Sequence, residues 1–171
     1  MSINNNTNNT DVADGLAGLQ QDAALWQLRA ARVDVKNFLQ GSDVTLFEPI
    51  GRTEFGVIER HLIGLRVGVI TRSDAIVERH RAALNALGAD AAQVQAVEAG
   101  AHGDLPKKIA AALRFSDKIT REPRDASPED IAELKASGFV AQDIVTLGQL
   151  ISYLSFQVRL LAGLRALGGA K

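Results

Sequence analysis

The chain has 171 residues, a formal net charge of −1 and no cysteine, and its length suits one compact domain. Hydrophobic residues make up 46% of it, enough to fill a core without metals or disulfides. The balance of 19 basic and 20 acidic residues argues against a protein built to bind nucleic acid or an anionic membrane. The lack of cysteine excludes disulfides, thiolate metal sites and cysteine nucleophiles. It also fits the reducing cytoplasm, which is the predicted location.

The opening "MSINNNTNNT" is polar and of low complexity. It predicts a disordered tail over residues 1–10, followed by a single domain over residues 11–171. The tail has neither the basic nor the apolar region of a secretion signal. Charges interrupt every apolar run before it reaches the roughly 18 residues of a membrane span, so no membrane association is expected.

Apolar residues recur at helical rather than alternating spacing, which predicts an all-α fold. The first helix is predicted over residues 23–39, with Gly41 as its stop. Its apolar face would consist of Leu25, Leu28, Val35 and Leu39. Residues 42–56, "SDVTLFEPIGRTEFG", are predicted to form a loop that the aromatic of "TLFEP" attaches to the core.

Residues 57–72 form the most apolar predicted helix, with apolar side chains on two sides. Gly64 and Gly68 lie four residues apart, which would let another backbone approach closely. A helix of this kind is expected at the centre of a domain or at a subunit interface.

The next helix is predicted to start at Ser73 or Asp74 as its N-cap and to end at Gly88. Another is predicted over residues 105–121, and the letters "SPED" then start a short helix that ends at "SGF". The last and longest helix is predicted over residues 141–167. Its coiled-coil-like seam would consist of Ile144, Leu147, Ile151, Leu154, Val158 and Leu161.

In the segment "HLIGLRVGVITRSDAIVERH", eleven residues separate His61 from Ser73, and Ile76 and His80 follow. This spacing resembles the AhpD-like superfamily, which includes alkylhydroperoxidase D, the carboxymuconolactone decarboxylases and uncharacterised peroxidase-related proteins. Its peroxidase members carry Glu, eleven residues, then Cys-x-x-Cys-x-x-x-His. The segment from "AALRFSDKITREPRDASPED" to "QVRLLAGL" is similar to the C-terminal part of the peroxidase-related proteins. The resemblance covers residues 11–167 and implies an all-α domain that assembles as a homo-oligomer, a trimer or hexamer.

Three of the four motif positions depart from the peroxidase pattern, since only His80 matches. A thiolate must attack the peroxide and a second thiol must resolve the product, so Ser73 and Ile76 exclude that mechanism. The resemblance to the decarboxylase branch leaves cofactor-free proton transfer, a decarboxylation or isomerisation of a small organic acid. His80 and His61 would be the acid and base, and Ser73 at a helix N-terminus would hold an anionic oxygen. The candidates for binding a substrate carboxylate are Arg60, Arg66 and Arg72.

Each candidate also has a structural interpretation. Ser73 is a common N-cap type, and His80 and His61 would be satisfied polar residues in a core or interface. These interpretations lead to the second hypothesis, a catalytically silent helical oligomer that binds a small ligand or partner at the former peroxidase site. Whether the chain is an enzyme stays open between the two. Glu78 and Arg79 are expected on a solvated helix face, and His102 is expected in a loop. Tyr153 and Trp26 are expected to be packing residues.

Two weaker hypotheses remain. His61 and His80 could bind a metal together with Asp74 or Glu78, but zinc sites usually need three or more protein ligands, and we predict no metal or cofactor. The stretch "SPEDIAELKASGFVAQDIVTLGQL" superficially resembles a helix-turn-helix. Its supposed recognition helix has no Arg or Lys, so no nucleic-acid partner is predicted.

Overall fold

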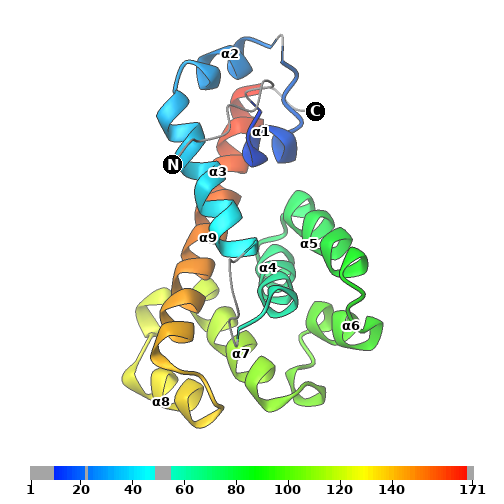
Figure 1. Ribbon diagram of the computed structural model, residues 1–171, viewed down its shortest axis with the longest axis vertical. Helices are drawn as coiled ribbons and strands as arrows, with labels where there is room; N and C mark the ends of the chain where they lie inside the picture. Colours follow the sequence, from blue (N-terminus) through cyan, green and yellow to red (C-terminus); the bar gives the residue numbers. More distant parts are fainter. Residues whose placement is uncertain (1–9, 22, 49–54, 169–171) are drawn as a thin grey trace.

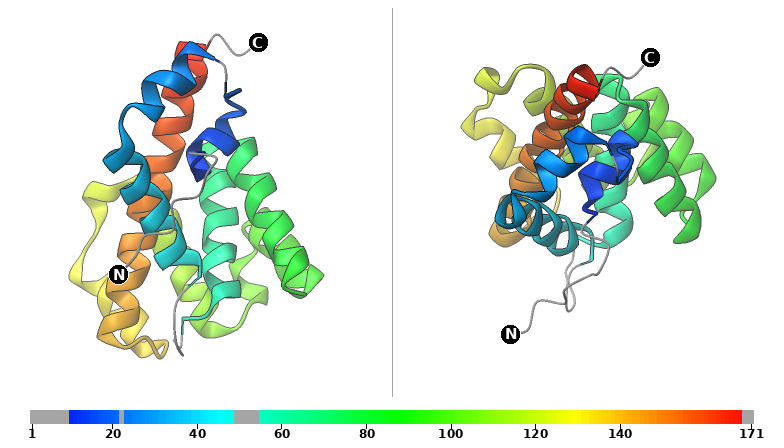
Figure 2. Two further views of the ribbon diagram at one scale, coloured as in Figure 1. Left: turned by 45° about the horizontal axis from the view of Figure 1, so that its top comes forward. Right: turned by 90° about the horizontal axis from the view of Figure 1, so that it is seen from above.

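The computed structural model describes residues 10–21, 23–48 and 55–168, and every regular element in these ranges is helical. The α-helices are α1 (Val12–Ala17), α2 (Ala24–Ala30), α3 (Val33–Phe47), α4 (Val57–Thr71), α5 (Asp74–Ala86), α6 (Ala91–Ala99), α7 (Lys107–Arg121), α8 (Pro128–Ala136) and α9 (Ala141–Gly168). Short 3-10 turns, η1 (His102–Asp104) and η2 (Pro123–Asp125), flank α7. The all-α prediction is confirmed (Figures 1 and 2).

Helix α4 is the central element of the fold. It packs against α3, α5, α6, α7 and α9, and each residue from Arg60 to Gly68 is buried. A helix that is apolar on two sides has no face to present to water. The central position predicted for this segment is therefore confirmed.

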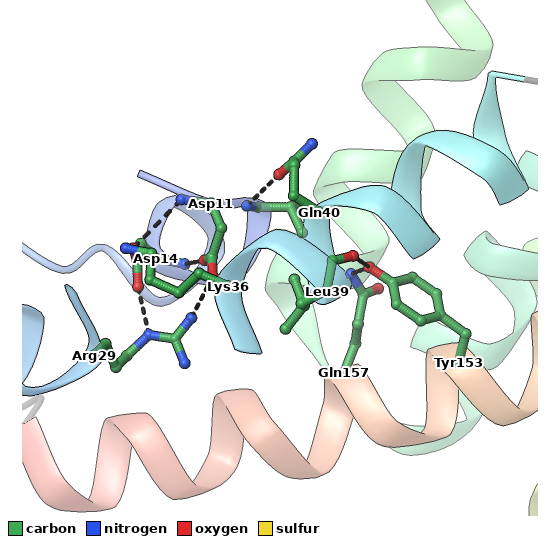
Figure 3. A network of polar contacts seen from close by, with 9 residues as sticks. Asp11, Asp14, Arg29, Lys36, Leu39, Gln40, Tyr153 and Gln157 are labelled. Atoms are coloured by element: carbon green, nitrogen blue, oxygen red, sulfur yellow. Dashed lines mark hydrogen bonds and ion pairs between the residues drawn. The ribbon is translucent and has the colours of Figure 1, made fainter. Parts of the chain in front are cut away.

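Helices α1, α2 and α3 lie along the C-terminal half of α9, away from α6 to α8 (Figure 1). They share a small core of their own with α9, built on Ala13, Leu39 and Leu164. A buried ion-pair network fastens this arm, because Asp14 is fully buried and accepts bonds from both Arg29 and Lys36, each at 2.5 Å. Figure 3 shows this network beside α3.

The prediction of one helix over residues 23–39 was wrong. Arg32 adopts φ −100° and ψ 58°, outside the helical region, and separates α2 from α3. Helix α3 then continues through Gly41 to Phe47, across the start of the predicted loop. Burial of Leu39, Leu46 and Phe47 on its inner side outweighs the weak helix propensity of glycine. Residues 49–54 of the predicted loop lie outside the described residues.

The apolar face predicted for residues 23–39 was also partly wrong, because Leu28 is 70% exposed and Val35 is 46% exposed. The break at Arg32 changes the rotation between the two segments, so the four leucines and valines do not share one face. Phe47 does attach this region to the core as expected, at 4% exposure.

Several helix ends lie where the sequence signals predicted them. Gly88 and Gly138 adopt the left-handed conformation, at φ 69° and 94°, and a capping box joins Ser127 and Asp130 at the start of α8. Helix α7 begins two residues later than predicted, with Pro106 as its N-cap. Helices α1 and α6 were not predicted, and α6 has apolar residues without a clear amphipathic pattern. The tail predicted over residues 1–10 lies outside the described residues except for Thr10.

Helix α9 is long and apolar enough, by length and composition alone, to cross a membrane, with a mean hydropathy of 1.3 over 18 residues. Core helices of soluble proteins meet the same criterion, and α9 places Leu147, Leu150, Ile151 and Leu154 in the main core. Packing against α4, α7 and α8 buries this side of the helix, which is 33% of the apolar window.

Candidate functional site

The two histidines singled out by the sequence lie on the neighbouring helices α4 and α5. A tight turn joins these helices, in which Arg72 adopts the left-handed conformation (φ 54°) and the Ser73 N–H donates to the Gly68 carbonyl at 2.9 Å. Gly64 on α4 faces the His80 ring so closely that a Cβ at this position would lie 2.5 Å from it. A Cβ on Gly68 would lie 3.0 Å from the backbone nitrogen of Val77, so the predicted close approach of another backbone is confirmed at Gly68. At Gly64 the space is taken by the side chain of His80.

His61 and His80 form a direct hydrogen bond, with 2.9 Å between the two Nδ1 atoms. The Phe47 ring packs against both imidazoles, with a centroid distance of 4.9 Å in each case. His80 has no exposed surface and His61 keeps 7%. The pair is thus enclosed by apolar neighbours, and one Nδ1 must donate while the other accepts.

Burial keeps both imidazoles neutral at pH 7. It lowers the pKa of His61 to about 4, an effect that the positive charge of Arg79 reinforces and Asp43 opposes. Burial likewise lowers the pKa of His80 well below its usual value, and the charges of Arg79 and His61 lower it further. A buried imidazolium without a carboxylate partner would be costly.

The buried environment also assigns the proton within the pair, which is inferred here from the hydrogen-bond partners. The Nε2 atom of His80 is buried and has no hydrogen-bond partner. An orphaned buried N–H is rarer than an orphaned acceptor, so the proton of His80 is placed on Nδ1. His80 then donates to His61, and His61 carries its own proton on Nε2.

The structure does not bring Ser73 to the histidines. Ser73 is the N-cap of α5, as its structural interpretation predicted, although its side chain makes no capping bond. Seven residues of helix separate it from His80, which is about 10 Å along the axis. Ile76, which takes the position of the second cysteine in the motif, is completely buried in the core.

The three arginines proposed to bind a carboxylate have other roles or positions. Arg60 donates to the carbonyls of Leu46 and Phe55, at 2.7 and 3.0 Å. Arg66 holds Asp117 through two bonds of 2.6 and 2.7 Å. Arg72 is exposed at the end of α4.

His102 is not the plain loop residue that was expected, because it begins η1 and lies 3.2 Å from Asp117. Asp117 therefore joins Arg66 of α4 to His102. Burial would raise the pKa of Asp117, but hydrogen bonds from Arg66 and His102 lower it overall. This cluster ties α4, η1 and α7 together.

Arg79 is an arginine whose positive charge acts on both histidines. It was expected on a solvated face, but its side chain is only 19% exposed and makes two bonds to Asp43, at 2.8 and 2.5 Å. Its guanidinium lies 5.1 Å from the centre of the Phe47 ring. Glu78, the neighbouring residue, is exposed as expected.

Asp43 is a functional candidate that the sequence did not indicate, because it fell in a predicted loop. Besides Arg79, it accepts hydrogen bonds from the Tyr153 hydroxyl at 2.9 Å and from Gln157 Nε2 at 3.3 Å. Gln157 also donates to the Tyr153 hydroxyl at 2.8 Å. Figure 3 shows Tyr153 and Gln157 reaching from α9 toward Leu39 of α3. Tyr153 therefore packs in the seam as predicted, but its hydroxyl is buried in a polar network.

An open groove of about 1650 Å³ runs along α3 and reaches Asp43, Arg79 and Tyr153. Neither imidazole lines it. Within the described ranges, no group of three or more His, Asp or Glu side chains is arranged to hold a metal ion. Asp74 and Glu78 are both exposed on α5, away from the buried imidazoles, so the metal set considered from sequence is not assembled.

No family model matches the chain, and no curated protein matches it. Several solved structures do, among them the following two. An uncharacterised peroxidase-related protein from Silicibacter sp. TM1040 aligns with a TM-score of 0.70 and 20% identity, over 82% of this chain and 71% of that one. An uncharacterised peroxidase-related protein with an alkylhydroperoxidase AhpD core, from Ralstonia eutropha JMP134, aligns with a TM-score of 0.60 and 16% identity, over 91% and 87%. The chain therefore has the AhpD-like fold of the peroxidase-related proteins.

Proposed function

We propose that this chain is a cysteine-free AhpD-like protein that binds a small organic ligand. We also propose that its former peroxidase site performs no catalysis. The observation that carries the proposal is the filling of that site. His80 and Ile76 have no exposed surface, and Phe47 covers both imidazoles. Neither imidazole lines the open groove along α3.

The sequence itself removes the peroxidase chemistry of the fold. An attacking thiolate and a resolving thiol are both needed to reduce a peroxide and regenerate the protein. The chain has no cysteine at any position. We therefore expect no consumption of cumene hydroperoxide by the purified protein.

A second candidate function is cofactor-free proton transfer on a small organic acid, a decarboxylation or isomerisation. The pair of neutral imidazoles joined at 2.9 Å favours it. Because His80 donates to His61, the neutral His61 ring would offer its Nε2–H as a hydrogen-bond donor to an oxyanion that forms on the substrate. A pKa of about 4 makes the ring a weak base at neutral pH, which limits this candidate since a catalytic pKa near the working pH is best.

Solvent exchange separates the two candidates without knowledge of the substrate. A panel of small carboxylic and lactone acids would be incubated with the protein in D₂O, and their C–H signals followed by ¹H NMR. The binding function predicts line broadening or shifts without deuterium incorporation. Incorporation that disappears in His61→Gln and persists in His102→Gln would overturn it in favour of proton transfer.

We also propose that the chain forms a homo-oligomer, as the resemblance implies. Large apolar side chains at the surface of α9 support this, with Val145 at 59% and Phe156 at 47% exposure. Contact with a second copy would remove them from water. Native mass spectrometry of the full chain tests the proposal, and a monomer at micromolar concentration would contradict it.

A further inference from the structure

The groove along α3 combines an apolar wall with the partly buried ion pair of Arg79 and Asp43. Its volume is about 1650 Å³, enough for a small organic molecule. The apolar residues that line it are Val12, Val33, Phe38, Val44 and Leu46. Phe38 is 75% exposed, which leaves a large aromatic face open to a ligand.

Arg79 reaches the groove with part of its hydrogen-bonding capacity unused. Its two terminal nitrogens each donate to one oxygen of Asp43. A guanidinium has five N–H groups in a planar fork, and no described residue accepts a bond from the Arg79 Nε–H. Because Tyr153 and Gln157 also hold Asp43, the carboxylate fixes Arg79 in place and leaves its Nε edge available.

We propose that this groove binds a small carboxylate with an apolar body, which accepts hydrogen bonds from the Nε edge of Arg79. This inference rests on the proposed ligand-binding function and names the class and place of the ligand. The apolar body lies along Phe38 and Val44 of α3. The other charged residues that line the groove are Asp11 and Lys36, and Lys36 already binds Asp14.

Ligand binding at Arg79 also has a reporter inside the protein. The Arg79 guanidinium lies over the Phe47 ring, which also contacts the two imidazoles. The charge of Arg79 lowers the pKa of His61. A bound carboxylate would neutralise part of this charge, so the pKa of His61 should rise.

Octanoate is the probe for the test, with 1-octanol as the uncharged match. Calorimetric titration of the full chain should show octanoate binding about tenfold or more tightly than octanol, because a charge-assisted hydrogen bond is lost with the alcohol. Arg79→Gln should weaken octanoate by a similar factor and leave octanol unchanged. Arg81→Gln, on the same helix but paired to Glu98 on α6, should bind octanoate like the parent protein.

Asp43→Asn distinguishes a binding role from a structural one. Removing the negative charge beside Arg79 should strengthen octanoate binding several-fold. If the pair had only a structural role, Asp43→Asn and Arg79→Gln would weaken octanoate binding equally. If Arg79→Gln does not fold, the double variant Asp43→Asn/Arg79→Gln removes both charges together and should fold without binding octanoate.

Equal affinity for octanoate and octanol would overturn the inference, as would unchanged octanoate binding in Arg79→Gln. Neither result depends on solvent exchange at His61. The failure of this inference is therefore distinguishable from the failure of the proposed function.

Discussion

Gly64→Ala tests the packing that forms the histidine pair. A Cβ on residue 64 would lie 2.5 to 2.6 Å from three atoms of the His80 ring, far inside van der Waals contact. The ring cannot move outward easily, because it is fully buried and held by His61 and Phe47. Either the pair breaks or α5 moves away from α4.

The expected size of the effect combines two opposing contributions. Alanine in place of glycine in a helix interior stabilises by about 1 kcal/mol. Overpacking a well-filled core costs about 1 to 3 kcal/mol, and loss of the bond between the imidazoles adds about 1 kcal/mol. The free energy of unfolding should therefore fall by about 1 to 3 kcal/mol.

Urea denaturation followed by circular dichroism measures this change. Gly41→Ala is the matched control, because it lies inside α3 with nothing within 4 Å of an added Cβ. It should stabilise by about 0.5 to 1 kcal/mol. A Gly64→Ala protein as stable as the Gly41→Ala protein would refute the close packing of His80 on α4.

The remaining predictions concern pH and the arm. The unfolded chain binds a proton at His61 near pH 6.5, whereas the folded chain does so only near pH 4. The contribution of neutral His61 to the free energy of unfolding is therefore fully present above about pH 6.5. Urea denaturation should show this free energy falling by about 3 kcal/mol as the pH drops to 4. The fall should be smaller in the double variant His61→Phe/His80→Leu. Asp14→Asn leaves Arg29 and Lys36 without their buried partner and should cost about 3 kcal/mol or more. Its hydrogen exchange should accelerate in α1 to α3 and stay unchanged in α4, and uniform acceleration would contradict a separate arm.

The sequence was sufficient for helices with strong local signals. The "SPED" capping box predicts the start of α8, and the left-handed Gly138 predicts its end. The two apolar sides of α4 likewise predict a central helix, since no solvent face is left. These features depend on neighbours in the chain and need no knowledge of the rest of the fold.

The rest depended on contacts between distant residues. Gly41 reads as a helix stop, yet burial of Leu39 and Phe47 against the core carries α3 past it. Arg79 reads as a solvated residue, because its partner Asp43 lies 36 positions earlier in the chain. Spacing did predict that His61 and His80 would meet, but it placed Ser73 with them, which the length of α5 prevents.

The neighbouring residues Arg79 and His80 of α5 lie in different surroundings. Successive residues of a helix point about 100° apart, so His80 turns inward to His61 while Arg79 turns toward Asp43 of α3. Phe47 separates the two, since its ring contacts both imidazoles and the guanidinium. The groove along α3 reaches Arg79 and neither imidazole. Ligand binding in this chain is therefore expected on the α3 side of α5, where the groove opens, and the histidine pair senses it through the charge of Arg79.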